Sequence, residues 1–226
     1  MLFDSVQIGA PDLEEAVRHY RILLGREGED GDGGHRFALE RGAVELIAGE
    51  AGVRSLRFAP EPGTPPWPSA EHAYHGLRVR TDARPAAAAV SCGPDVPHAI
   101  DHVVVQSPDL DRAIALWRDR LGVRLALDRE FPQRGMRILF FRSAGVTLEF
   151  GGALAPASNA PDVYWGVAYQ VADVAACRAR VLAAGVQVSE VRAGHKRGTF
   201  VATAKSHTAG VPTLLIQPVA EPPPKG

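Results

Sequence analysis

One histidine of this chain lies within a run of strand-forming residues, where it could either bind a metal ion or pack against its neighbours. It is His102 in "AIDHVVVQ", a segment rich in valine. A glutamate, Glu149 in "VTLEFGG", has a similar setting further along the chain. A lone histidine in an apolar strand is most often packed or hydrogen-bonded, and a glutamate in a strand usually faces solvent. Residue type alone therefore leaves both interpretations open for each side chain.

Three further segments combine charged or aromatic residues with turn signals. In "RAGHKRGTF", Lys196 precedes a glycine turn, either as part of a cationic rim that orients an acidic or carbonyl-bearing ligand or simply as part of a solvated loop. In "FPQRGMRILFF", Arg137 and Phe141 could contact a ligand, although their alternation with apolar residues indicates a strand with one exposed face. In "PDVYWGV", Tyr164 and Trp165 could wall a cavity or pack in the core.

The overall charge gives no sign of a polyanionic partner. The chain has 226 residues, 25 Lys and Arg against 26 Asp and Glu, and a formal net charge of -1. Because the two signs are interspersed, there is no electrostatic footprint for nucleic acid or for an anionic membrane surface. The length allows one large or two small domains. We therefore expect a small-molecule ligand, with no nucleic acid and no membrane as partner.

Cysteine usage and the N-terminal sequence indicate a cytoplasmic protein. Cys92 and Cys177 are far apart and belong to no CxxC motif, so they predict neither a thiolate zinc site nor a redox pair, and we expect both to be small buried residues. The first residues lack the pattern of a signal peptide. No apolar run approaches the roughly 20 residues that span a bilayer.

The chain contains an internal repeat. Shifting "LFDSVQIGAPDLEEAVRHYRILLGR" onto the segment around His102 places Asp4 on Asp101 and continues through a shared strand and helix. In the later copy the apolar residues follow helical spacing and form one stripe. A weaker third copy is "GVAYQVADVAACRARVLAAGVQV". Each predicted helix begins after an aspartate cap and stops at a glycine: Asp12 and Gly25, Asp109 and Gly122, Asp173 and Gly185.

Short strands follow each predicted helix, so that the repeated unit reads βαβββ. We predict an α+β fold in which tandem units form curled mixed sheets around a cavity. Residues 98–220 are expected to form one domain of two units, 99–152 and 163–220. Residues 1–95 are expected to form an abbreviated domain, because the proline-rich "PEPGTPPWPSAEH" stands where a helix should be. The strands expected there include "VRSLRFAP", "HGLRVRTD" and "AAAAVSC", with "GPDVPH" as the linker.

The paired units that begin "DHVVV..PDLDRAIALWRDRLG" resemble the vicinal oxygen chelate superfamily, which includes glyoxalase I, extradiol dioxygenases, and fosfomycin- and bleomycin-resistance proteins. The resemblance implies a curled sheet whose inward-facing side chains bind a divalent metal ion (iron, manganese, zinc or nickel). It assigns His102 as the first-strand ligand and Glu149 as the last-strand ligand. Neighbouring strands of a concave sheet would bring these two donors together.

The sequence departs from the pattern that the resemblance implies. Gly166 falls where a second histidine or glutamine ligand is expected, and Leu214 falls where a second carboxylate is expected. Gln170 shares the facing parity of Gly166 and could substitute, and His207 in "AKSHTAGVP" could reach in from a loop.

The N-terminal unit departs further. Ser5 lies opposite His102 and Leu46 opposite Glu149, although Glu45 is adjacent. We predict no metal there.

Two functions from different classes follow, with a third for the N-terminal region. The first is a metal-dependent enzyme, similar to glyoxalases or dioxygenases, that acts on a small oxygen-bearing molecule in the C-terminal domain. The alternative is a metal-free protein that binds and sequesters a small molecule, like the bleomycin-resistance proteins. The third is that the N-terminal domain serves as an interaction module that completes the cavity or replaces a dimer partner. The catalytic residues, the substrate and the choice between monomer and homodimer stay open.

Overall fold

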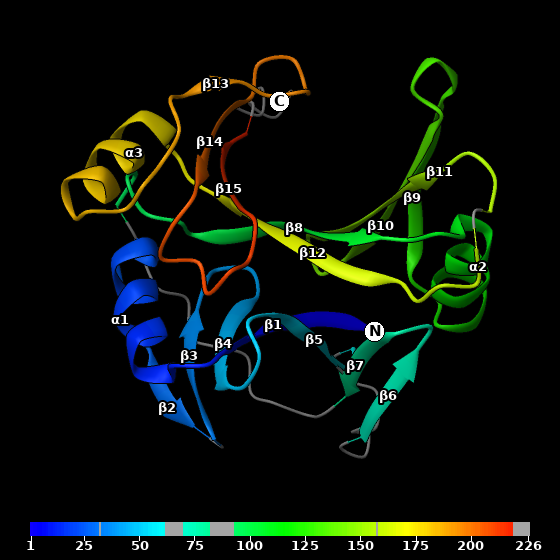
Figure 1. Cartoon of the computed structure of the whole chain (residues 1–226), viewed down its shortest axis with the longest axis horizontal. Helices are drawn as coiled ribbons and strands as arrows, with labels where there is room; N and C mark the ends of the chain where they lie inside the picture. The colour runs from blue at the N-terminus through cyan, green and yellow to red at the C-terminus, as the bar shows by residue number, and fades with distance from the viewer. Residues whose placement is uncertain (32, 62–69, 82–92, 157, 219–226) are drawn as a thin grey trace, which may run out of the picture.

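The computed structural model describes residues 1–31, 33–61, 70–81, 93–156 and 158–218. These residues form two curled mixed sheets with few helices, and neither sheet closes into a barrel (Figure 1). The predicted α+β class is confirmed. The sheets stand back to back, and their ends curve away from each other, so that their hollow faces point in opposite directions (Figure 1). No helix of the described segments has the length and hydrophobicity to span a bilayer.

The first sheet has seven strands in the order β2-β3-β4-β1-β5-β7-β6. Strand β4 is parallel to β1, and β5 is antiparallel to β1 on its other side. The expected strands "VRSLRFAP" and "HGLRVRTD" correspond to β5 and β7, whereas "AAAAVSC" lies outside the described residues. The elements of the first sheet and its helix are β1 Leu2–Ala10, α1 Leu13–Leu24, β2 Glu29–Gly31, β3 Gly34–Ala38, β4 Ala43–Ala48, β5 Gly52–Ala59, β6 Ala70–Tyr74 and β7 Leu77–Thr81.

The second sheet has eight strands in the order β13-β14-β15-β12-β8-β11-β10-β9. Two units of this sheet meet where β8 and β12 pair in antiparallel orientation. After α3, Val188 forms only an isolated bridge to Ala204 before β13 begins. Its elements are β8 Ala99–Gln106, α2 Leu110–Ile114, a π-helical turn Ala115–Arg120, β9 Arg124–Phe131, a 3-10 turn Pro132–Arg134, β10 Met136–Ser143, β11 Val146–Ala153, β12 Val163–Gln170, α3 Val174–Ala183, β13 Arg192–Ala193, β14 Phe200–Ala204 and β15 Thr213–Gln217.

The three helices begin at the aspartates that the sequence indicates. The side chains of Asp12, Asp109 and Asp173 accept hydrogen bonds from backbone N–H groups in the first turn of α1, α2 and α3. These bonds satisfy donors that a helix leaves unpaired at its start. Gly25 ends α1 in the left-handed region at φ 60°, a conformation that favours glycine. The three N-cap predictions and the glycine stop of α1 are confirmed, whereas α2 gives way to a π-helical turn after Ile114, before the chain reaches Gly122.

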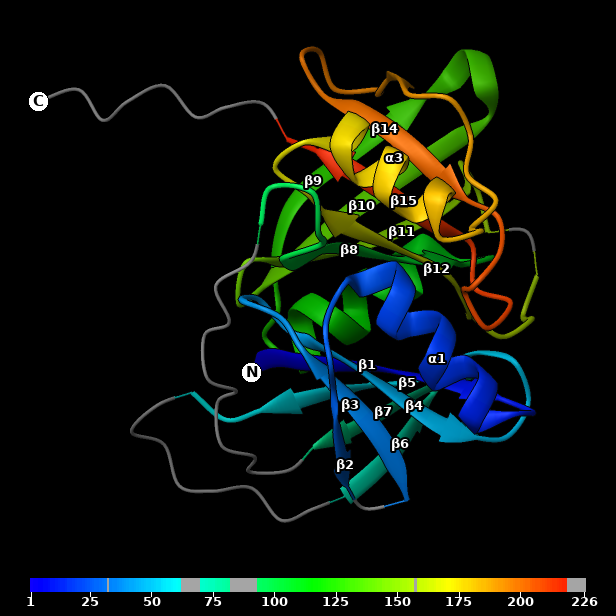
Figure 2. The same cartoon turned by 90° about the vertical axis from the view of Figure 1, so that its left-hand side faces the viewer.

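Among the described residues, the buried apolar side chains form one cluster that draws on both sheets and on the helices. Figure 2 shows the two sheets stacked one above the other, with α1 and α3 beside them. Trp117, which is fully buried, contacts Phe58 of the first sheet at a ring separation of 5.9 Å and Phe150 of the second at 5.7 Å. Cys177 is also buried, as expected, whereas Cys92 lies outside the described residues. Because the convex faces share this core, the hollow faces of both sheets remain turned outward.

Candidate functional site

His102 and Glu149 lie on the hollow face of the second sheet. Strand β11 runs parallel to β8, with Thr147 beside His102 and Glu149 beside Val104. Alternate residues of a strand share one face. The residues between them on the two strands are fully buried toward the core: Val103, Val105, Leu148 and Phe150. His102 and Glu149 are therefore diagonal neighbours on the open face, on adjacent strands.

The carboxylate of Asp101 fixes the ring of His102. The register of β8 and β12 shifts between Ala168 and Tyr169, which leaves Asp101 as the extra residue of a bulge. The Nδ1 of His102 lies 2.7 Å from Oδ1 of Asp101, and because a carboxylate only accepts, Nδ1 carries the proton of this bond. Within the described residues, Nε2 of His102 has no hydrogen bond, so it is available to a ligand.

The first sheet supports this pair through a chain of hydrogen bonds. Gln170 on β12 donates its Nε2 to Oδ2 of Asp101 at 2.5 Å, and its Oε1 accepts from the guanidinium of Arg41. Arg41 belongs to the loop between β3 and β4, and its carbonyl accepts from the N–H of Ile100. Burial alone would raise the pKa of Asp101, but the hydrogen bonds from His102 and Gln170 and the nearby charge of Arg142 lower it on balance.

The residues around His102 do not fit a tightly held metal ion. The strand pairing gives Gly166 and Leu214 the positions in the second unit that His102 and Glu149 have in the first, as expected. A Cβ at Gly166 would lie 2.7 Å from the carbonyl oxygen of Pro212, so this position has no room for a ligand side chain. No group of three or more His, Cys, Asp or Glu with metal-binding geometry occurs in the part of the chain that the structure describes. Catalytic zinc sites usually have three protein ligands.

The two expected substitute ligands have other partners. Both ends of the Gln170 amide are engaged by Asp101 and Arg41. His207 lies in the loop between β14 and β15, where its ring packs at 4.0 Å from that of His19 on α1. Burial and the charge of His19 lower the pKa of His207. His207 thus contacts the helix of the first sheet and not the face that carries His102.

Glu149 borders a broad hollow on the same face. The hollow has a volume of about 680 Å³, and its lining includes Glu149, Val163, Trp165 and Met136. These three apolar side chains are 40–52% exposed, which is unusual for large hydrophobic residues. Glu149 has no hydrogen bond or ion pair among the described residues. The hollow therefore combines a free carboxylate with an uncovered apolar wall.

Of the five expected ligand-contacting residues, Trp165 is the one that reaches this hollow. Arg137 lies on the face of the second sheet opposite the hollow, where its guanidinium bonds to Asp111 on α2 and to Asp128 on β9, each at 2.7 Å. The other three lie elsewhere: Phe141 is fully buried beside Trp117, Tyr164 donates its hydroxyl to the carbonyl of Arg78 on β7, and Lys196 is exposed in the turn before β14.

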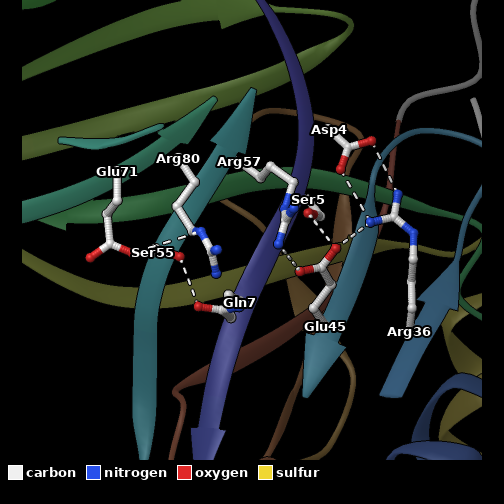
Figure 3. A network of polar contacts seen from close by, with 9 residues as sticks. All are labelled: Asp4, Ser5, Gln7, Arg36, Glu45, Ser55, Arg57, Glu71 and Arg80. Atoms are coloured by element: carbon white, nitrogen blue, oxygen red, sulfur yellow. Dashed lines mark hydrogen bonds and ion pairs between the residues drawn. The ribbon is translucent and has the colours of Figure 1, made fainter. Parts of the chain in front are cut away.

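The hollow face of the first sheet carries its own network of ion pairs (Figure 3). Glu45 on β4 pairs with Gln7 on β1, as Glu149 pairs with Val104 on β8, so Glu45 is the counterpart of Glu149. This register corrects the sequence-based alignment of Leu46 with Glu149, because Leu46 is fully buried on the core side. The carboxylate of Glu45 bonds to Arg36 at 2.5 Å and to Arg57 at 3.0 Å. Guanidinium groups thus surround this carboxylate.

Comparisons with known proteins agree with this architecture. Residues 101–203 match the family model described as "Glyoxalase/Bleomycin resistance protein/Dioxygenase superfamily". An ethylmalonyl-CoA/methylmalonyl-CoA epimerase of Cereibacter sphaeroides is 27% identical over 97 residues, 39% of this chain and 72% of the epimerase.

Two solved structures are similar to different extents of the chain. Methylmalonyl-CoA epimerase from Mycobacterium tuberculosis is 22% identical, with a TM-score of 0.45 over 54% of this chain and 89% of its own. A mutant of 4-hydroxymandelate synthase from Streptomyces coelicolor is 12% identical, with a TM-score of 0.68 over 95% of this chain and 91% of its own. The second likeness covers 95% of this chain, so the similarity of fold includes both sheets.

Proposed function

We propose that this chain, whose residues 101–203 belong to the glyoxalase, bleomycin-resistance and dioxygenase superfamily, binds a small oxygen-bearing molecule on the hollow face of its second sheet. The observation that carries the proposal is the placement of His102 and Glu149. They share one open face, and both retain unused hydrogen-bonding capacity: Nε2 of His102 and the carboxylate oxygens of Glu149. A ligand with hydroxyl groups would complete these bonds by donating, because the carboxylate oxygens of Glu149 and the unprotonated Nε2 of His102 are both acceptors.

The two side chains themselves, without a resident metal, are proposed as the binding groups. A partly buried carboxylate without a partner is costly, which supports a ligand that donates a hydrogen bond to Glu149. Asp101 holds the ring of His102 in one orientation and so reduces the entropy lost when a ligand binds. This is the metal-free alternative of the superfamily, and Gly166 and Leu214 support it because neither can supply a further ligand.

A specific observation favours metal-dependent catalysis as a second candidate. A metal-ligating histidine usually donates its other ring N–H to a carboxylate, and Asp101 provides that arrangement for His102. In this case His102 and Glu149 would be two of the protein ligands of a divalent ion, which would supply Lewis-acid chemistry. The epimerase activity in the name of the Cereibacter relative would extend to this chain only if catalysis were demonstrated.

Elemental analysis and tryptophan fluorescence separate these candidates. We would purify the full chain without chelator or histidine tag, measure its metal content, and then titrate it with 1,2-decanediol and with zinc, manganese, iron and nickel salts. Trp165 borders the hollow and is 48% exposed, so a bound molecule should change its emission. The variant Trp165→Phe identifies the signal that comes from this residue.

We expect saturable 1,2-decanediol binding that His102→Gln and Glu149→Gln weaken by about tenfold. Substitutions of exposed residues on the first sheet and its helix, His72→Gln and Glu14→Gln, should leave it unchanged. Stoichiometric metal in the parent that is lost in both site variants would establish the second candidate instead. Absence of binding, or equal binding by all variants, would contradict the proposed site.

A further inference from the structure

Two arginines face each other across β9 and β10 and form no ion pair among the described residues, although the charge of Arg142 also acts on Asp101. Arg124 and Arg142 are directly paired in the register of these strands. Arg142 also pairs with Thr147, which pairs with His102, so all four side chains share a row on the hollow face. Both arginines are exposed, and neither has a hydrogen bond or ion pair within the described part of the chain. Like charges placed directly opposite in a sheet destabilise it.

The arginine pair lines its own hollow of about 490 Å³. The remaining wall is the β10–β11 turn and one bulged residue of β9: Ser143, Ala144, Gly145 and Ala126. Arg41 packs against Gly145 from the first sheet, since a Cβ added there would lie 2.7 Å from its Cδ. A third cation therefore borders this end of the face. Guanidinium groups bind carboxylate and phosphoryl oxygens through parallel hydrogen bonds.

The hollow face thus changes along the strands from a cationic end, through an acidic middle, to an apolar end. Arg142 lies at one end of β10 and Ile138 and Met136 lie toward the other, with Glu149 between the two ends on the neighbouring strand. From the row of Arg142 to the row of Ile138 is four residues, or about 13 Å at the rise of a β-strand. Glu149 repels an anion from the middle, so the cationic end is where an anionic group would be bound.

We propose that Arg124 and Arg142 form a subsite for the anionic head of an amphipathic ligand whose apolar body extends past Glu149 toward Trp165. This inference rests on the proposed function, because it assigns the substrate class of the same site. The head is a carboxylate or a phosphoryl group, since the same guanidinium geometry binds both. The body is an apolar chain or ring system that reaches about 13 Å from the head.

Titrations with four probes of equal chain length test the subsite. Decanoate, decyl phosphate, 1,2-decanediol and decylamine are added to the full chain while Trp165 emission is followed, at two salt concentrations. We expect decanoate or decyl phosphate to bind at least tenfold more tightly than 1,2-decanediol, and decylamine to bind most weakly. The ratio of decanoate to decyl phosphate identifies which anionic group the subsite prefers.

Variants locate the effect. Arg124→Gln and Arg142→Gln should each weaken anion binding by about tenfold and leave 1,2-decanediol binding unchanged. Arg142→Lys, which keeps the charge but not the planar guanidinium, should restore part of the affinity. The exposed Arg18 on α1 gives the matched control, Arg18→Gln. Arg124→Gln should melt at or above the temperature of the parent, because it removes a like-charge contact.

The outcomes separate this inference from the proposed function. If 1,2-decanediol binds through His102 and Glu149 but the anions bind no better, or if the arginine variants bind anions as the parent does, the subsite is overturned while the proposed function stands. If none of the probes binds, both fail.

Discussion

At the scale of single residues, the pair of Asp101 and His102 distinguishes this histidine from one that merely packs in a strand. Its ring is held by a carboxylate whose second oxygen is itself held by Gln170, and one ring nitrogen is left for a ligand. The arrangement suits either a hydrogen-bonding group or a metal ligand. Gly166, on the neighbouring strand β12, cannot supply a further metal ligand, which favours the hydrogen-bonding role of His102 over the metal-binding role.

Replacing Asp101 by asparagine should lower stability in a pH-dependent way. The pKa of Asp101 is lowered in the folded protein, so its stabilising contribution is present above the unfolded pKa, about 3.9, and is lost as the pH falls through the folded value. We expect Asp101→Asn to reduce the free energy of unfolding at pH 7 by about 1–2 kcal/mol. Urea unfolding at pH 7, 5 and 3 should show the difference from the parent shrinking below pH 4. A constant difference across this range would contradict the charged pair.

The positions of His102 and Glu149 were predictable because the resemblance of the repeated units implies one ligand on the first strand and one on the last strand. The two-residue period of β-strands then places each side chain on the face opposite the buried residues of its own strand. Asp101 could not be predicted from this alternation, because a bulge in β8 interrupts it and places the carboxylate of Asp101 next to His102. Arg142 was missed because its significance depends on Arg124, which is eighteen positions away in sequence and pairs with it only after the hairpin forms.

At the scale of elements, the two sheets use equivalent positions in opposite ways. Glu149 is free on the second sheet, whereas its counterpart Glu45 is enclosed by Arg36 and Arg57 on the first (Figure 3). The helix caps were predictable because they depend on local sequence. The counterpart of Glu149 on the first sheet was not predictable, since a one-residue error in strand register selects Leu46, on the core face, in place of Glu45, on the hollow face.

Glu45→Gln should destabilise the first sheet strongly. The side chains of Glu45 and Arg57 are 7% and 4% exposed, and breaking a buried ion pair leaves a charge without compensation. We expect a loss of about 3 kcal/mol in the free energy of unfolding by urea. Glu71 provides the matched control, because it lies 3.7 Å from Arg80 on the same sheet but is 45% exposed. Glu71→Gln should cost less than about 0.5 kcal/mol, and equal losses for the two variants would refute the role of burial.

At the scale of the whole molecule, the two sheets are joined by backbone as well as side-chain contacts. Ser143 on β10 accepts from the N–H of Phe3 at 2.8 Å and donates to the carbonyl of Met1 at 2.9 Å. Tyr20 on α1 donates to the carbonyl of Thr208. The division into residues 1–95 and 98–220 stays a prediction from the repeat. The shared core nevertheless indicates that the two parts unfold together.

Arg180 offers a direct test of that coupling. From α3 its guanidinium donates to the carbonyls of Ile22 and Leu23 at the end of α1, at 2.7 and 3.0 Å, where a helix leaves acceptors unpaired. We expect the parent to show one calorimetric transition, and Arg180→Ala to lower its midpoint by roughly 4–8 °C, the effect of about 2 kcal/mol in a chain of this size. Arg178→Ala, which removes contacts to Ser189 and Glu190 within the second part, is the control. If the two parts unfolded independently, two calorimetric transitions would be resolved, and Arg180→Ala would leave the midpoint of the later transition unchanged. A single transition with a lower midpoint would mean that the first sheet stabilises the second sheet, which carries His102.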